Sequence, residues 1–158
     1  MQTAWDAERA RAIIDGHRSL KGALLPILHD LQDAFGYIDD AAVPLLAEGL
    51  NLSSADIHGV VSFYHEFRRT RPGRHIVKVC VAEACQARGS DTLVEHLTHR
   101  LGIDLGTTDA AGEFTLEAVY CLGNCALGPS ALIDGALVGR LSAARLDAVL
   151  TARTEERA

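Results

Sequence analysis

All four cysteines of the chain lie in two short stretches, VCVAEACQARGS and YCLGNCALGPS. Cys80 and Cys85 form a C-x4-C pair in the first stretch, and Cys121 and Cys125 form a C-x3-C pair in the second. Each pair follows a segment predicted to be a β-strand and leads into glycine-containing sequence, so we expect both loops to meet at the same edge of one sheet. Four thiols brought together in this way indicate a metal site.

The composition predicts a folded protein whose partners are other proteins. The chain has 158 residues, of which 48% are hydrophobic, which suits one domain or one domain with a smaller appendage. Its formal net charge is −6. Because lysine and arginine are scattered rather than clustered, a nucleic-acid or anionic-membrane surface is disfavoured.

The sequence predicts a cytoplasmic protein. It contains no run of about 18 uncharged apolar residues, the length that a membrane-spanning helix needs. Its first residues, MQTAWDAERARAIID, include acids and lack the apolar core of a signal peptide. In the reducing cytoplasm, paired cysteines are more often metal ligands or redox groups than structural disulfides.

The N-terminal part of the chain is predicted to be helical. Apolar residues recur at helical spacing, and helices are expected over residues 4–17, 20–35, 42–49 and 55–67. The second helix is expected to kink or to begin near Ala23, because Pro26 fits best in a first turn. Gly36 and Gly49 are expected to end the second and third helices. Residues 51–54 offer side chains that can cap the fourth.

The pattern changes after Arg71-Pro72-Gly73, where a mixed sheet with packed helices is predicted. Strands are expected over residues 75–80, 114–120, 131–134 and 137–140. Ser90 or Asp91 is expected to cap one helix, and Ser142 to cap the last one. A hairpin is predicted at Asp134-Gly135.

The spacing of the thiols favours an iron–sulfur cluster. Thiolates suit zinc, cuprous copper and iron–sulfur clusters, but structural zinc sites most often use C-x2-C pairs and both pairs here are wider. A two-iron core needs two ligands on each iron, and its anionic sulfurs need backbone N–H donors. Gly89, Gly123 and Gly128 would allow such close approach. Zinc and redox-active or buried thiols stay open as alternatives.

The histidines and Arg88 are expected to have packing or surface roles rather than metal-binding ones. His58 and His65 are placed seven residues apart on the fourth helix, as packed or surface side chains. His75, His96 and His99 are expected to be solvated, and Arg88, close to the first cysteine pair, to be a surface arginine.

Four segments of the chain resemble one known family. They are LLPILHDLQDAFGYI, GVVSFYHEF, the C-x4-C strand and loop, and FTLEAVYCLGNCALGPSALIDG. These are similar to the thioredoxin-like [2Fe–2S] subunit shared by respiratory complex I and several NAD-linked dehydrogenases. The resemblance implies an α/β fold, in which an N-terminal helical bundle (residues 1–72) precedes a thioredoxin-like domain with a mixed β-sheet (residues 73–158).

The resemblance also implies one [2Fe–2S] cluster on Cys80, Cys85, Cys121 and Cys125, and no catalytic residue in this chain. In the family, a neighbouring subunit carries FMN and binds NAD(H), and the cluster exchanges single electrons with that flavin. This chain offers no dinucleotide-binding glycine loop or P-loop of its own.

Within the family, AEACQARG and VYCLGNCALGPSALIDG are most similar to the gamma subunit of soluble NAD-dependent formate dehydrogenase, whose large subunit contains molybdenum or tungsten. Complex I relatives more usually have an acidic residue at the position of Tyr120 and alanine at that of Asn124. The alternative context is the corresponding subunit of complex I or of an NAD-reducing hydrogenase. A zinc-stabilised protein-interaction module is the alternative of another class.

Overall fold

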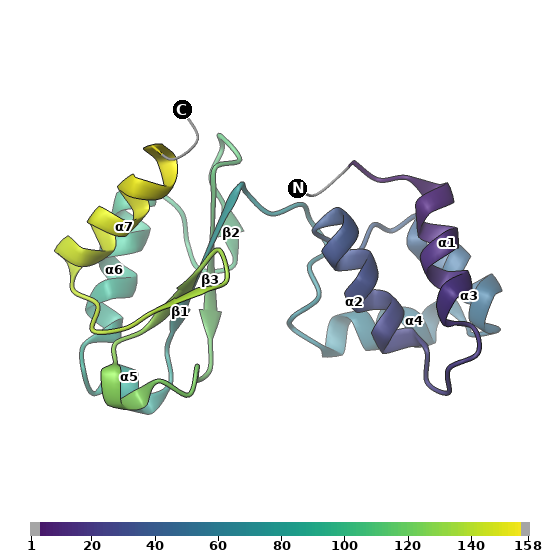
Figure 1. Cartoon of the computed structure of the whole chain (residues 1–158), viewed down its shortest axis with the longest axis horizontal. Helices are drawn as coiled ribbons and strands as arrows, with labels where there is room; N and C mark the ends of the chain where they lie inside the picture. Colours follow the sequence, from purple (N-terminus) through teal and green to yellow (C-terminus); the bar gives the residue numbers. More distant parts are fainter. Residues whose placement is uncertain (1–3, 156–158) are drawn as a thin grey trace. The chain divides into compact units, whose positions relative to one another are not determined.

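The chain divides into two compact units, Met1–Arg71 and Pro72–Ala158 (Figure 1). The computed structural model describes residues 4–155. Within this range, no helix is both long and apolar enough to cross a membrane.

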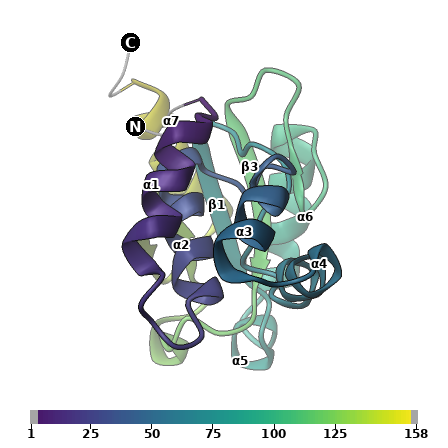
Figure 2. The same ribbon diagram turned by 90° about the vertical axis from the view of Figure 1, so that its right-hand side faces the viewer.

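The first unit is a bundle of four helices, as predicted. They are α1 (Ala7–His17), α2 (Leu24–Phe35), α3 (Ala42–Leu50) and α4 (Ser54–Phe63). Helix α1 packs against α2 and α3, and α3 packs against α4 (Figure 2). The centre of the bundle is apolar, and its largest fully buried side chains are Ile27, Leu28, Leu31, Phe35, Ile38, Leu46 and Ile57.

The ends of the helices follow local chemistry. Helix α2 begins after Ala23, with Pro26 in its first turn, and ends at Gly36, whose φ is +89°; both predictions are confirmed. The Ser53 hydroxyl accepts a hydrogen bond from the Asp56 backbone N–H at 3.1 Å, while the Asp56 carboxylate accepts one from the Ser53 backbone N–H. Helix α4 therefore starts with a capping box.

The prediction that Gly49 ends the third helix was wrong. Helix α3 continues to Leu50, and Asn51 takes up the left-handed conformation, with φ +53°. Gly49 serves packing instead, because a Cβ at this position would lie 2.6 Å from Ile14 Cγ2. The residue lets α1 approach α3 closely.

The fourth helix is shorter than predicted. It ends at Phe63, and the next residue, Tyr64, has extended backbone. His65 and Phe67 therefore lie beyond the helix rather than on it. The Phe67 ring is still buried, which explains why the apolar spacing suggested a longer helix.

The second unit is a five-stranded mixed sheet with helices. Its elements are β1 (His75–Cys80), α5 (Glu83–Gln86), α6 (Ser90–Leu101), β2 (Thr107–Thr108), β3 (Phe114–Val119), the 3-10 turn η1 (Cys125–Leu127), β4 (Ala131–Ile133), β5 (Ala136–Val138) and α7 (Ala143–Glu155). The strand order is β2-β3-β1-β4-β5. Strands β1 and β3 are parallel, and the other pairs are antiparallel. The predicted α/β class with a mixed sheet is confirmed.

Helices α6 and α7 cover one face of this sheet (Figure 1). The apolar layer between them and the strands includes Val77, Leu97, Leu116, Ile133 and Leu146, all fully buried. Because β1 and β3 run in parallel, the crossover through α6 brings their carboxyl ends to the same edge of the sheet. Both predicted cysteine loops begin at that edge.

In the second unit, the predicted hairpin and the predicted cap of α7 are confirmed, whereas the predicted cap of α6 is wrong. Asp134 and Gly135 have φ of +52° and +81° and connect β4 to β5, which confirms the hairpin. The Ser142 hydroxyl accepts a hydrogen bond from Arg145 N at 3.3 Å, as expected of a cap for α7. The cap predicted for α6 was wrong, because Gly89 precedes this helix and no side chain caps it. Strand β2 and helix α5 were not predicted.

Candidate metal centre

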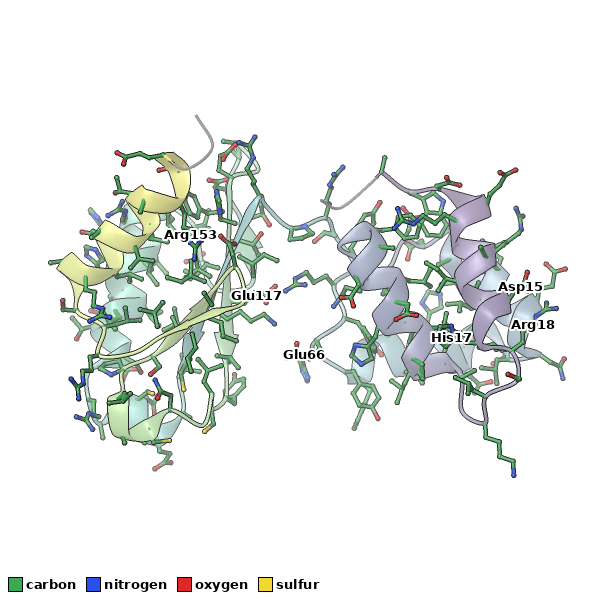
Figure 3. All side chains as sticks on the ribbon, in the orientation of Figure 1. Asp15, His17, Arg18, Glu66, Glu117 and Arg153 are labelled. Carbon is green, nitrogen blue, oxygen red and sulfur yellow. The ribbon has the colours of Figure 1, made fainter. Side chains whose placement is uncertain are left out.

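Strand pairing brings the two cysteine loops together. Cys80, the last residue of β1, lies opposite Val119, the last residue of β3, and Cys121 follows Val119 by two residues. The Val81 backbone N–H donates to Val119 O at 2.9 Å, which continues the pairing past the end of β1. The sulfur atoms lie at one end of the sheet, near α5 (Figure 3).

The first cysteine pair is buried. Cys80 and Cys85 are each 2% exposed, and their thiols are hydrogen-bonded to each other. Cys85 lies within α5, the single helical turn that follows β1. The short helix therefore directs the second thiol of the loop back toward the first.

The second cysteine pair faces solvent. Cys121 and Cys125 are exposed, and their Sγ atoms lie 3.9 Å apart. Cys121 has φ +94°, an unfavourable conformation for a residue with a side chain. The Gly123 backbone N–H lies 3.4 Å from Cys121 Sγ. The loop thus holds a strained backbone that keeps its two sulfurs together.

Backbone N–H groups of the second cysteine loop form hydrogen bonds to a sulfur of the first loop. Burial raises the pKa of the Cys80 thiol, but hydrogen bonds outweigh it and the pKa falls below its ordinary value. The Ala82 N–H is the largest of these, followed by the Cys85 thiol and then by the N–H groups of Cys121 and Leu122. Such donors stabilise a thiolate, the form that binds metals.

The other shifts show that the four thiols share one electrostatic environment. Burial raises the pKa of Cys85, as does the Cys80 thiol, while the Ser130 backbone N–H opposes this. The pKa of Cys125 is raised by the hydrogen bond and the charge of Cys121, then by burial and the charge of Cys80. Negative charge on one pair therefore raises the pKa of a thiol in the other, and a bound cation would relieve this repulsion.

Two of the three glycines singled out from the sequence approach the sulfurs. A Cβ on Gly128 would lie 3.2 Å from Cys85 Sγ, and Gly123 donates its N–H to Cys121. Gly89 has a different role, since a Cβ there would meet nothing within 4 Å and its φ of +90° turns the chain into α6. Arg88 joins the loops, with Nη1 3.4 Å from Ala126 O.

The two exposed sulfurs are spaced as two ligands of one metal atom would be. Among residues 4–155, no group of three or more His, Cys, Asp or Glu side chains surrounds a point that fits a metal ion. Two thiolates on one tetrahedral zinc, each at about 2.3 Å, are about 3.8 Å apart. The 3.9 Å between Cys121 and Cys125 therefore suits two ligands of one tetrahedral metal, with the other pair beside them.

The histidines supply no further metal donors. His58, His65 and His99 are exposed. The expectation that His75 is solvated was wrong, because it is 5% exposed and its Nδ1 lies 2.8 Å from Asp134 Oδ2. His96 is also not freely solvated, since its Nε2 lies 2.8 Å from Asp147 Oδ1. The sequence around His75 contains no signal that would distinguish a buried histidine at the start of a strand from a solvent-exposed one.

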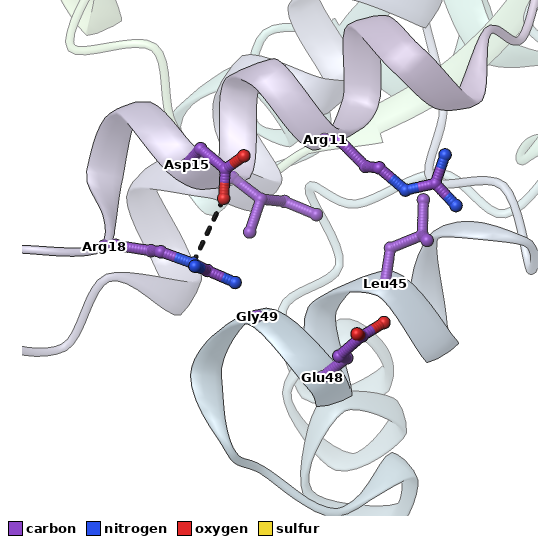
Figure 4. Close-up of a pocket in the computed structure, with 7 residues that line it drawn as sticks. Arg11, Asp15, Arg18, Leu45, Glu48 and Gly49 are labelled. Carbon is purple, nitrogen blue, oxygen red and sulfur yellow. Dashed lines mark ion pairs between the residues drawn. The ribbon is translucent and has the colours of Figure 1, made fainter.

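A pocket between α1 and α3 is lined by charged and aliphatic side chains. It is lined by Arg11, Ile14, Asp15, Arg18, Leu45, Glu48 and Gly49 (Figure 4). Asp15 and Arg18 form an ion pair at 3.1 Å, so the lining charges partly neutralise one another. The pocket contains no thiol, histidine or hydroxyl nucleophile.

Known proteins with similar sequences belong to redox complexes. One subunit of the NADH-quinone oxidoreductase of Pseudomonas aeruginosa is 39% identical over 114 residues, which cover 72% of this chain and 69% of that protein. The HndA subunit of the NADP-reducing hydrogenase of Solidesulfovibrio fructosivorans is 30% identical over 130 residues, which cover 82% of this chain and 76% of that protein.

The fold is shared with a solved structure. A chain in the crystal structure of an air-oxidized NAD+-reducing [NiFe]-hydrogenase aligns with a TM-score of 0.73 and 29% identity, over 88% of this chain. This chain spans 24% of the hydrogenase chain. A family model described as thioredoxin-like [2Fe–2S] ferredoxin matches residues 10–154. The protein, with its two cysteine loops at one sheet edge, belongs to the thioredoxin-like [2Fe–2S] ferredoxin family.

Proposed function

We propose that Cys80, Cys85, Cys121 and Cys125 bind one [2Fe–2S] cluster, with Cys80 and Cys85 on one iron and Cys121 and Cys125 on the other. The cluster supplies a reversible one-electron carrier when bound. The observation that carries the proposal is the meeting of the two loops, in which Cys121 Sγ and Cys125 Sγ lie 3.9 Å apart and Gly128 of the second loop closes on Cys85 Sγ of the first. Backbone N–H groups of the second loop also face the first-loop sulfurs. Such donors stabilise the negative charge of an iron–sulfur site and tune its potential.

The roles of the two pairs differ in this proposal. The buried Cys80 and Cys85 anchor the site to the sheet, and the exposed Cys121 and Cys125 face the side from which a partner can approach. Tyr120, next to Cys121, is 81% exposed. This surface is where we place the contact with the subunit that delivers or accepts electrons.

The parent complex we propose is an NAD-dependent formate dehydrogenase. Its neighbouring subunit would carry FMN and bind NAD(H), and its large subunit would hold molybdenum or tungsten. The support is the resemblance of AEACQARG and VYCLGNCALGPSALIDG to the gamma subunit of that enzyme. In this proposal residues 1–72 and 73–158 are the helical and cluster-binding domains of a cytoplasmic subunit.

A second context is favoured by the relatives. The matching subunits of the NADH-quinone oxidoreductase and of the NADP-reducing hydrogenase align over more than two thirds of this chain. A corresponding place in such a complex would keep the same cluster and the same flavin-bearing neighbour. Only the reaction at the distant substrate site would differ.

The cluster is tested on anaerobically purified protein. We expect a red-brown protein with iron and acid-labile sulfide in equal amounts, and an electron paramagnetic resonance (EPR) signal that appears only on reduction. The Cys121→Ser/Cys125→Ser double variant should lose the normal cluster while circular dichroism shows retained helices. Gln86→Ala, a change beside Cys85 that spares the thiols, is the control and should keep the cluster. A normal cluster in the double variant would refute the ligand assignment.

The alternatives give different outcomes in the same sample. A colourless protein that contains zinc and no sulfide would support the interaction module instead. A metal-free protein with Cys80–Cys85 or Cys121–Cys125 disulfides would indicate a thiol oxidoreductase.

The parent complex is tested by purifying the tagged chain with its native partners. Formate-dependent NAD+ reduction, together with FMN and molybdenum or tungsten in the purified complex, would support the formate enzyme. Hydrogen-dependent NAD+ reduction or NADH-dependent quinone reduction in the same preparation would overturn that assignment and leave the cluster assignment intact.

A further inference from the structure

A hydrogen bond joins Asn124, between the two cysteines of the second loop, to Ser130 at the end of that loop. Asn124 Nδ2 donates to Ser130 Oγ at 3.0 Å, and the Ser130 hydroxyl donates to Leu127 O at 3.4 Å. Ser130 is 1% exposed. The serine hydroxyl is therefore held as both acceptor and donor within the loop.

The backbone of Ser130 contacts both cysteines of the first loop. Its carbonyl accepts a hydrogen bond from Cys80 N at 3.0 Å. Its N–H faces the Cys85 thiol and partly offsets the effects that raise the pKa of that group, and the same segment closes on this sulfur at Gly128, where a Cβ would lie 3.2 Å from Cys85 Sγ. Ser130 is thus a residue of the second loop whose backbone meets both members of the buried pair.

The Asn124 amide lies in a closely packed position. A Cβ on Gly139 would lie 2.7 Å from Asn124 Nδ2 and 2.8 Å from Leu127 O. Arg140 N also donates to Leu127 O. The segment after β5 therefore fits against the amide, and no side chain at position 139 is compatible with it.

We infer that Asn124 is a positioning residue, which holds Ser130 so that its backbone N–H stays on Cys85 Sγ and raises the reduction potential of the cluster. The inference rests on the proposed function. An N–H donor stabilises the reduced, more negative state of an iron–sulfur site more than the oxidised state. When the amide is removed, Ser130 relaxes away from Cys85, and the potential becomes more negative.

The test is a redox titration of the purified cluster-containing protein, followed by EPR. Asn124→Ala and Ser130→Ala should each shift the midpoint potential to more negative values. The double variant should shift it no further than the larger single change, because both changes break the same hydrogen bond. Gln86→Ala, a loss of an amide on the first loop, should leave the potential unchanged.

The outcomes separate this inference from the proposed function. A wild-type protein without a [2Fe–2S] spectrum would overturn the proposed function itself. A wild-type cluster with an unchanged potential in Asn124→Ala would overturn only the role of Asn124. If Asn124→Ala does not retain its cluster, Ser130→Ala decides, and an unchanged potential in that variant would overturn the inference as well.

Discussion

His75 Nδ1 and Asp134 Oδ2 lie 2.8 Å apart and join the first residue of β1 to the turn between β4 and β5. Asp134 Oδ1 also accepts a hydrogen bond from Ile76 N at 2.9 Å. The imidazole is buried, and its ring centroid lies 5.3 Å from that of Phe114, with the two rings tilted by 33°. One carboxylate therefore fixes a buried side chain and a backbone donor at the start of the central strand.

Loss of this carboxylate should destabilise the second unit. Asp134→Ala leaves the buried imidazole and the Ile76 N–H without an acceptor, so we expect the free energy of unfolding to fall by about 1–3 kcal/mol. Asp134→Asn is the control, because Asn-Gly suits the same turn and keeps one acceptor. The free energy of unfolding, measured with urea, should fall less in Asp134→Asn than in Asp134→Ala. Equal losses in the two variants would contradict this ordering, because they would mean that the turn preference and the one acceptor that asparagine keeps contribute nothing.

Two serines at helix starts should respond in opposite ways to alanine. The Ser53 hydroxyl caps α4, so Ser53→Ala should lower the free energy of unfolding by about 1 kcal/mol.

Ser90 begins α6, but its buried hydroxyl has no hydrogen-bond partner among the described residues. Ser90→Ala removes a buried unsatisfied group, so stability should stay constant or rise. A loss of about 1 kcal/mol on Ser90→Ala in urea unfolding would show that the hydroxyl has a partner.

A methyl group on Gly128 should disturb the thiol site more than the fold. Gly128 has φ −68° and ψ 163°, which alanine adopts without strain. The added Cβ would lie 3.2 Å from Cys85 Sγ, so Gly128→Ala should alter the visible spectrum and speed up cluster loss to a chelator. Unfolding free energy should change by less than about 1 kcal/mol.

Gly106→Ala is the complementary control for that change. Its φ is +83° and a Cβ there would meet nothing within 4 Å. The variant should therefore lose about 1 kcal/mol of stability through backbone strain, with an unchanged cluster spectrum. The same spectral change in both glycine variants would contradict a specific contact at Cys85.

The sequence predicted the elements whose signals are local and periodic. The apolar spacing from Leu20 to Phe35 predicted α2, and Pro26 offered a start near Ala23 as one of two possibilities; the helix spans Leu24–Phe35 and ends at Gly36. Asp134-Gly135 predicted the hairpin because few residues adopt positive φ at both turn positions. The convergence of the cysteine loops followed from the two strand patterns that precede them.

Other features depend on contacts that no local pattern records. The role of Gly49 is set by Ile14, on a different helix. The burial of His75 depends on Asp134, fifty-nine positions away. The Ser130 N–H on Cys85 likewise joins the two loops, and only the fold brings these groups together. Sequence spacing predicted the thiols but not the donors that surround them.

A charge network between α6 and α7 gives the last prediction. Asp147 Oδ1 lies 2.8 Å from His96 Nε2 and also pairs with Arg100. The hydrogen bond from His96 holds the pKa of Asp147 below its ordinary value; burial opposes this, and Arg100 adds to it. A carboxylate with a lowered pKa in the folded state stabilises the protein above its unfolded pKa of about 3.9.

Asp147→Asn should therefore lower the free energy of unfolding in a pH-dependent way. Because the side chain is about one third exposed, we expect a loss of about 0.5–1 kcal/mol near neutral pH. The difference from wild type should shrink as the pH falls below about 4 and vanish below the folded pKa, where Asp147 is protonated in both states. Asp104→Asn, in the exposed loop after α6, is the matched control and should change the free energy of unfolding by less than about 0.5 kcal/mol. Urea unfolding at a series of pH values measures both variants. A difference in unfolding free energy between wild type and Asp147→Asn that widens on acidification would contradict the stabilising role of the Asp147 charge.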